Sequence, residues 1–343
     1  MSEIDLSIVS ALQESPRAAW TDIARVLQIG AETLTQRWQH LSSAGLAWIA
    51  VDEVHPGRRA LTFVLVNAPG NARAQLLDGA LEDPRIRTVH ATTGSRAFCL
   101  YIETDTYDDT ARCIEQRVDS VRGITDRMVL PVVEVVSSGA DWRTRALDAT
   151  QRHALEAFRR PARQSTRPLA PTDSVVSSLQ AELSIDGRAS IAELTARLRT
   201  HHHLDVSEST VARRLTRMLD DPLYRIRCDV SPEHLGWHAV TMLWLRVPPG
   251  LANKLCRDSA STRHRIKTEL PDVRSFMITL GPTNLHVTAW LHRVQDVPAF
   301  EADLIRWLEG SGEIMERAMC HTTNKRMGFS IENGKRTNQR SAP

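Results

Sequence analysis

Three arginines with helical spacing are the residues best placed to do chemistry in this sequence: Arg213, Arg214 and Arg217. Residues three and four positions apart lie on one face of a helix. Guanidinium groups on such a face can bind phosphate oxygens or the hydrogen-bonding edge of guanine. A less basic set of the same kind occurs earlier in the chain, at Thr33, Gln36, Arg37 and His40. The sequence therefore offers two polar helical surfaces, of which the later is the more basic.

Other kinds of chemistry have little support in the sequence. It contains no G-x-G-x-x-G, P-loop, H-E-x-x-H or G-x-S-x-G pattern. The compact run His201-His202-His203 has three potential metal ligands, but adjacent residues of an extended loop cannot all face one ion. Cys320 and His321 are neighbours in sequence, and such neighbours do not usually converge on one substrate. We therefore expect no metal, no cofactor and no enzymatic activity.

Composition is that of a globular protein with near-neutral charge. The chain has 343 residues, of which 42% are hydrophobic and 24% charged, with 43 basic and 41 acidic side chains. These values exclude a largely disordered chain. The five cysteines are odd in number and form no C-x-x-C pair, which favours a reducing compartment. Because no apolar run approaches roughly 20 residues and no signal peptide is visible, we expect a cytoplasmic protein with no membrane partner.

The helices that would carry the polar surfaces belong to a unit that occurs twice. Residues 12–18 align with 183–189, and residues 32–41 align with 209–218, with six extra residues within 199–205 of the second copy. Each copy begins with three predicted helices, and the last two have the layout of a helix-turn-helix. A strand-like segment follows in each copy, at 46–54 and 224–230, and we expect it to form a wing.

The rest of each copy alternates strands and helices in the order βαββαβ, which predicts a ferredoxin-like sheet with both helices on one face. The expected strands are 60–67, 86–93, 97–103 and 126–136 in the first copy, and 238–247, 273–280, 284–291 and 313–322 in the second. The expected helices are 72–81, 107–121, 251–268 and 297–308, with a further helix at 142–160 before a proline-containing linker at 161–171.

The predicted fold class is α+β, with two winged helix-turn-helix domains and two ferredoxin-like βαββαβ domains in tandem. The expected segments are a degenerate winged helix-turn-helix at 1–56, a ligand-sensing or dimerisation domain at 57–137, a helical linker at 138–172, a second winged helix-turn-helix at 173–235, a second sheet domain at 236–325 and a basic tail at 326–343.

This order of elements resembles the Lrp/AsnC family of bacterial transcription regulators. The resemblance rests on residues 186–194, residues 206–215 and the turn at 231–236. We call the three helices that begin each copy its front. The resemblance implies binding of double-stranded DNA through the third helix of each front. The contacts would come from Ser207, Ser209, Thr210, Arg213, Arg214 and Arg217 in the second copy and from Thr33, Gln36, Arg37 and His40 in the first. Since the second set is more basic, we expect it to dominate affinity, with Arg214 reading a base.

The resemblance also implies a small-molecule effector, such as an amino acid, bound near the turn between the second and third strands of each sheet. The residues expected there are Thr93, Gly94, Ser95 and Arg96 in the first copy and Gly281, Thr283 and Asn284 in the second. A second copy of the chain is an expected partner, because two ferredoxin-like sheets would leave edges and faces uncovered.

Two alternatives remain open at this point. One is an enzyme like the branch resembling this family that decarboxylates siroheme, in which His90 and His286 would converge in a cleft of the sheet domains. The other is an interaction protein whose helix-turn-helix has lost DNA binding, which the poorly basic helix of the first copy would suit.

Overall fold

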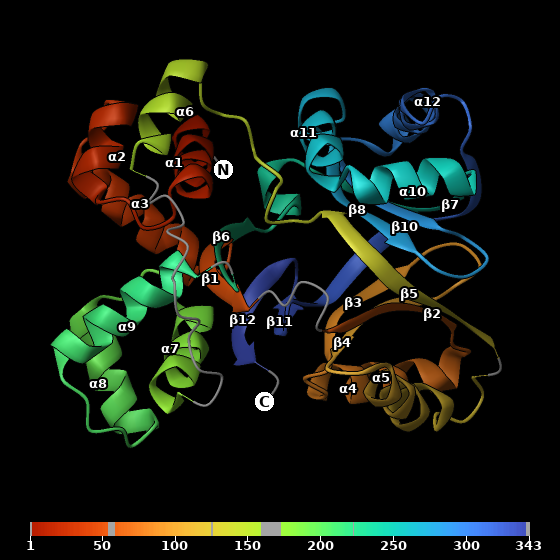
Figure 1. The fold of residues 1–343 in the computed structure, drawn as a ribbon, viewed down its shortest axis with the longest axis horizontal. Helices are drawn as coiled ribbons and strands as arrows, with labels where there is room; N and C mark the ends of the chain where they lie inside the picture. The colour runs from red at the N-terminus through yellow and green to blue at the C-terminus, as the bar shows by residue number, and fades with distance from the viewer. Residues whose placement is uncertain (1, 54–58, 125, 159–172, 222, 341–343) are drawn as a thin grey trace. The chain divides into compact units, whose positions relative to one another are not determined.

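The structure, a computed structural model, describes residues 2–53, 59–124, 126–158, 173–221 and 223–340. The chain divides into two compact units, each built from an early and a late part of the sequence (Figure 1). Unit 1 contains Met1–Pro56 and Arg143–Ser231, and unit 2 contains Gly57–Trp142 and Pro232–Pro343. The two helical fronts therefore share one unit and the two sheet segments share the other. The predicted linker at 161–171 lies outside the described residues.

Unit 1 consists of helices and two short strands. Its elements are α1 (Glu3–Glu14), α2 (Trp20–Leu27), α3 (Ala31–Ser43), β1 (Ala47–Glu53), α6 (Ala149–Glu156), α7 (Ser174–Ile185), α8 (Ile191–His201), α9 (Glu208–Asp220) and β6 (Tyr224–Val230). Side-chain oxygens of Ser2, Asp148, Asp173, Ser190 and Ser207 accept backbone N–H groups at the starts of α1, α6, α7, α8 and α9. Such caps fix where these helices begin.

The strands expected to be wings pair with each other instead. β1 runs antiparallel to β6, and the middle of the ladder pairs Ala50 with Arg227. Each strand also packs on the other copy, since Val51 of β1 belongs to the apolar core that includes Leu179 and Leu215. A lone strand leaves the backbone groups on both of its edges unpaired, and in this two-stranded sheet the equivalent strand of the second copy satisfies those on one edge.

The helix expected at 142–160 is shorter in the structure. Residues 142–148 are not helical, and α6 starts only after Asp148, whose carboxylate accepts the backbone N–H of Gln151. The helix expected at 251–268 is interrupted at Asp258, which separates α10 (Pro249–Arg257) from α11 (Ser259–Glu269).

Unit 2 contains one sheet that closes on itself, where we expected two ferredoxin-like domains in tandem. Its ring of eight strands has the order β10-β3-β4-β2-β5-β8-β9-β7, and β7 pairs again with β10. The strands are β2 (Ala60–Asn67), β3 (Ile86–Thr92), β4 (Phe98–Thr104), β5 (Asp126–Ser137), β7 (Ala239–Arg246), β8 (Val273–Thr279), β9 (Leu285–Leu291) and β10 (Glu313–Arg326).

Closure depends on the two longest strands. β5 pairs with β2 of its own copy and with β8 of the other, while β10 pairs with β7 and with β3. Register shifts in the β5–β8 and β10–β3 ladders mark the bends that closure requires. These eight strands thus pair within one chain, so uncovered edges no longer argue for a homodimer, and the oligomeric state stays a prediction.

Helices cover the outside of the closed sheet (Figure 1). Apolar side chains fill its inside, and two further apolar cores lie between the sheet and its helices. The covering elements are α4 (Gly70–Glu82), α5 (Tyr107–Ile114) with the π-helical turn Glu115–Asp119, α10, α11 and α12 (Val297–Trp307). Residues expected to be a basic tail form the strands β11 (Phe329–Glu332) and β12 (Lys335–Arg340), which extend the sheet from β10. Among the described residues, no helix is long and apolar enough to cross a membrane.

Candidate functional site

The outward faces of α3 and α9 carry most of the residues expected to contact DNA. Thr33, Gln36 and His40 are exposed on α3. In the second copy Ser207, at the start of α9, and Ser209 and Arg213 are exposed, whereas Thr210, Arg214 and Arg217 are half-buried. The three arginines therefore do not form one exposed stripe, and Arg213 is the one that faces solvent.

Arg37 and Arg214 both form ion pairs inside the helical unit. Arg37 Nη1 lies 3.0 Å from a carboxylate oxygen of Asp5, near the start of α1, and Arg214 Nη2 lies 2.9 Å from Asp173, the capping residue of α7. In each copy the third helix is thereby tied to the start of the first. We expected both arginines to contact DNA, and in this structure each has a carboxylate partner within the chain.

A reciprocal arginine clamp joins the two helix-turn-helix segments. Arg188 donates to the carbonyl oxygens of Pro16 and Ala18, at 2.6 and 2.8 Å. In return, Arg17 donates to the carbonyl oxygens of Gly187 and Ala189. The Arg188 guanidinium also lies 4.0 Å from the centre of the Trp20 ring. Burial lowers the pKa of Arg188 to about 10, so the clamp remains cationic at neutral pH.

The turns expected to bind an effector pack against strands of the closed sheet. Gly94 and Gly281 have φ values of +95° and +133°, which favour glycine. An added Cβ on Gly94 would lie 3.0 Å from a backbone oxygen of Arg317, and one on Gly281 would lie 2.8 Å from a methyl group of Leu130.

The other residues of these turns also have partners within the chain. Thr93 Oγ1 accepts the backbone N–H of Met319, Ser95 bonds to Glu316, and Arg96 pairs with Asp126. Thr283 is buried, and its carbonyl accepts from Thr279, while the Asn284 side chain exchanges two hydrogen bonds of 2.8 Å with the backbone of Val247. These contacts hold the sheet together, and effector binding at the turns stays a prediction.

A polar cluster lies on the inner side of the closed sheet. His90 Nδ1 is 3.3 Å from Cys320 Sγ and 3.1 Å from Thr323 Oγ1. His286 Nε2 is 2.9 Å from Thr288 Oγ1, and its ring lies 4.4 Å from that of Phe63. The sequence linked Cys320 with its neighbour His321, but the true partner of Cys320 is His90, 230 positions away. Only knowledge of the β10–β3 pairing could have revealed it.

Burial keeps this cluster uncharged at neutral pH. It lowers the pKa of His90 and His286 to about 3 and raises that of the Cys320 thiol to about 11. A neutral thiol next to a neutral imidazole is not the ion pair that activates a cysteine nucleophile. The cluster can instead donate and accept hydrogen bonds inside an apolar sheet.

We predict that acid destabilises the protein through these two histidines. The unfolded chain takes up a proton near pH 6.5, whereas the folded chain does so only near pH 3. The free energy of unfolding therefore loses nothing to these histidines above pH 6.5, and it decreases through them as the pH falls from 6.5 towards 3. Urea denaturation at several pH values should show this fall, and His286→Gln should make it shallower. An equally steep fall in the variant would contradict the assignment to His286.

The histidine run at 201–203 does not form a metal centre in the described chain. His201 Nδ1 and His202 Nε2 both lie near Glu182 Oε1, at 3.2 and 3.0 Å. Within the described residues, no group of three or more His, Cys, Asp or Glu side chains could hold a metal ion.

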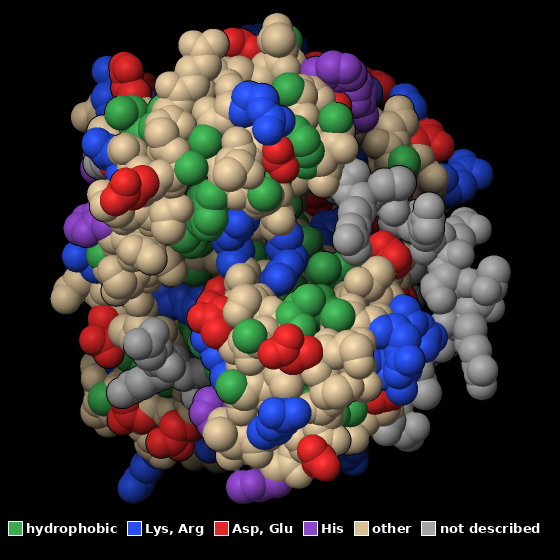
Figure 2. All heavy atoms as spheres, turned by 90° about the vertical axis from the view of Figure 1, so that its left-hand side faces the viewer, with side chains coloured by type: hydrophobic (Ala, Val, Ile, Leu, Met, Phe, Trp, Pro, Cys, Tyr) green, Lys and Arg blue, Asp and Glu red, His purple; other side chains and the backbone are tan. Residues whose placement is uncertain are grey.

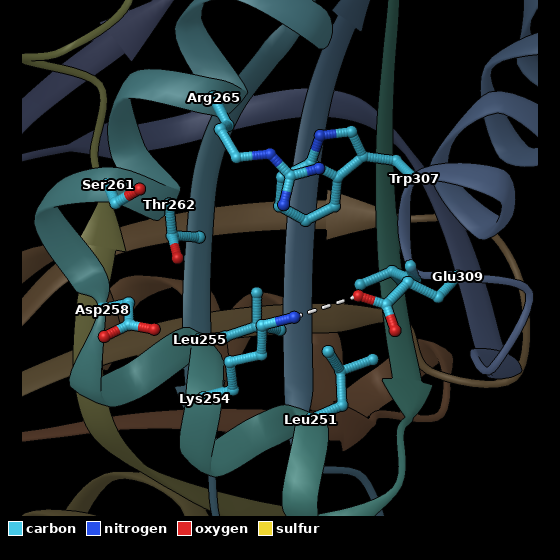
Figure 3. A pocket seen from close by; sticks show the side chains of 10 residues that line it. Leu251, Lys254, Leu255, Asp258, Ser261, Thr262, Arg265, Trp307 and Glu309 are labelled. Atoms are coloured by element: carbon cyan, nitrogen blue, oxygen red, sulfur yellow. Dashed lines mark hydrogen bonds and ion pairs between the residues drawn. The ribbon is translucent and has the colours of Figure 1, made fainter.

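One small pocket, of about 60 Å³, lies on the outer face of unit 2 where α10 and α11 meet the end of α12 (Figure 3). Lys254 and Glu309 form an ion pair of 3.2 Å at its edge, and the Arg265 guanidinium lies 4.6 Å from the Trp307 ring centre. Leu251 and Leu255 form an apolar part of the pocket wall. None of the residues expected to bind an effector lines this pocket.

Comparison with known proteins gives two kinds of likeness. Residues 1–42 match the AsnC-type helix-turn-helix domain. Over the whole chain, the structure resembles the siroheme decarboxylase NirDL in complex with an iron-uroporphyrin III analogue, with a TM-score of 0.56, 13% identity, and coverage of 95% of this chain and 93% of that one. NirDL without that ligand gives a TM-score of 0.55 at 12% identity, with the same coverage. Escherichia coli AsnC covers 39% of this chain and 93% of its own, with a TM-score of 0.35 and 17% identity. No curated protein sequence matches.

The match to the AsnC-type helix-turn-helix domain falls on the first copy, and the degeneracy expected there stays a prediction. One expectation is wrong. The expectation that the chain is not an enzyme is contradicted, because the fold that matches along nearly its whole length is that of an enzyme, NirDL. At 13% identity this likeness concerns the fold alone. The chain therefore combines an AsnC-type helix-turn-helix at its start with an architecture similar, over 95% of its length, to that of a siroheme decarboxylase.

Proposed function

We propose that the chain is a sequence-specific DNA-binding regulator of the Lrp/AsnC type, built as a tandem fusion of two such units. The observation that carries this proposal is the AsnC-type helix-turn-helix at residues 1–42, together with a second three-helix front joined to it by the Arg17–Arg188 clamp. In a helix-turn-helix protein the recognition helix enters the major groove and reads bases with its outward side chains.

Electrostatics favour a protein that reads bases over one that relies on a wide basic surface. The net charge is +2, and Figure 2 shows basic, acidic and apolar side chains interspersed on the face that it draws. Because this face carries no extended patch of positive charge, most of the affinity for DNA has to come from a few specific contacts. Arg213 is the exposed arginine of α9 and the strongest candidate for such a contact.

We predict that Arg213→Ala weakens binding to a selected DNA site by about 1–3 kcal/mol, because a guanidinium that reads guanine contributes that much discrimination. Fluorescence anisotropy on a site selected from random duplexes measures the loss. The control is Arg293→Ala, which replaces an exposed arginine of unit 2 that pairs with Asp296, and it should bind as the wild type does. Equal affinities for the wild type and Arg213→Ala would contradict the role of Arg213.

A second candidate function is a siroheme-decarboxylase-like enzyme, favoured by the fold match over 95% of the chain. The cluster of His90, Cys320 and Thr323 offers polar side chains within the sheet. The test is an absorption titration with iron-uroporphyrin III, followed by incubation with siroheme and mass spectrometry for loss of carbon dioxide. A shifted absorption band and a product lighter by the mass of carbon dioxide would establish this function. An unchanged spectrum and intact siroheme would exclude it.

A further inference from the structure

We infer that one chain reads a DNA site made of two unlike halves, with guanine required in the half bound by α9 and not in the half bound by α3. This inference rests on the proposed DNA-binding function. It follows from two observations: matching contacts make the two fronts equivalent, and different exposed residues make their outward faces different.

A pseudo-two-fold relation connects the two fronts of unit 1. The ladder between β1 and β6 is centred on Ala50 and Arg227, and each of these lies 17 positions after its aligned threonine, Thr33 or Thr210. An antiparallel ladder centred on equivalent residues has a local two-fold axis at that pair. One chain thus carries the two readers that a symmetric dimer obtains from two chains.

Further contacts repeat across this axis. The clamp is reciprocal, since Arg188 bonds to the backbone beside Arg17 and Arg17 to the backbone beside Arg188. The third helices are fixed in the same manner, because the aligned residues Arg37 and Arg214 each pair with a carboxylate near the start of the first helix. The alignment therefore identifies residues that occupy matching places on α3 and α9.

The exposed positions of that alignment carry different chemistry. Gln36 matches Arg213, and both are exposed one residue before the ion-paired arginine. A glutamine amide can bond in two places to adenine, whereas an arginine guanidinium bonds in two places to the O6 and N7 of guanine. Next along the face, exposed Gln39 matches exposed Thr216. Two identical half-sites would leave one of these helices with mismatched hydrogen-bonding groups.

Exchanging the two side chains tests the inference directly. Sites are selected from random duplexes with the wild type, Gln36→Arg, Arg213→Gln and the double variant, and Arg293→Gln serves as the control. Because both positions are exposed, the folds should persist, and urea midpoints equal to that of the wild type verify this. We expect Arg213→Gln to reduce preference for guanine in one half by about ten-fold or more. The double variant should place the guanine requirement in the other half.

Each outcome is decisive. A guanine requirement that follows the arginine from one half to the other supports the inference. A selected site with two identical halves, or a base preference unchanged in all three variants, overturns it while leaving DNA binding intact. If the wild type selects no sequence, the proposed function fails, and the inference fails with it.

Discussion

Replacing Lys325 by methionine is expected to lower the free energy of unfolding by about 3–5 kcal/mol. This lysine on β10 is fully buried, and its Nζ donates to three backbone carbonyls, those of Ala80, Leu81 and Asp83, at 3.2, 3.0 and 2.8 Å. These carbonyls lie at the end of α4, where no further helical N–H can reach them. Burial lowers the pKa of Lys325 to about 8, so it remains a cation at pH 7. Methionine would fill the space but leave the carbonyls without this donor.

Chemical denaturation of Lys325→Met beside Lys254→Met provides the test. Lys254 is exposed and pairs with Glu309, and an exposed pair of this kind contributes about 1 kcal/mol or less. The structure predicts a large loss for the first variant and a small one for the second. Similar losses in both variants would show that the three carbonyls do not depend on Lys325.

Arg188→Ala is expected to have the second large effect, a loss of about 3–5 kcal/mol in the stability of unit 1. The guanidinium makes two charged hydrogen bonds to carbonyls of the other front and stacks on Trp20. Because these contacts join the fronts, the same variant should also weaken binding to a selected site by disturbing both reading helices. Denaturation monitored by tryptophan fluorescence and anisotropy titration measure the two losses.

The control for this prediction is Arg25→Ala, on α2, whose side chain is 71% exposed and pairs with Asp22 within its own helix. We expect a change of about 0.5 kcal/mol or less for it. If Arg188→Ala unfolds at the same urea concentration as Arg25→Ala, the clamp does not stabilise the unit.

Local patterns in the sequence predicted most helices and strands well. The third helix of the second copy, expected to carry the residues from Ser207 to Arg217, is α9 (Glu208–Asp220), and Ser207 caps its start. The pairing of elements could not be predicted in this way. β5 pairs with β8 as well as with β2. The pairing with β8 depends on contacts between residues more than a hundred positions apart, and no local propensity encodes them.

The candidate site was predicted only in part, for a similar reason. Helical spacing predicted that Arg213 and Arg214 lie on one surface. Neighbouring residues of a helix point about 100° apart, however, and Arg214 points toward Asp173. A signal was available: each copy has an aspartate at the start of its first helix and an arginine in its third. From the absence of catalytic motifs we expected that the chain is not an enzyme. That step was too strong, because similarity to the fold of NirDL does not require any short sequence motif.

The most direct test of the central claim is hydroxyl-radical footprinting of the full chain on its selected DNA site, at a ratio of one chain to one site. We predict two protected segments separated by unprotected sugars, with protection of one segment weakened by Arg213→Ala and protection of the other unchanged. Protection of a single segment, or none at concentrations where the chain is folded, would contradict the claim that one chain carries two DNA-reading helices.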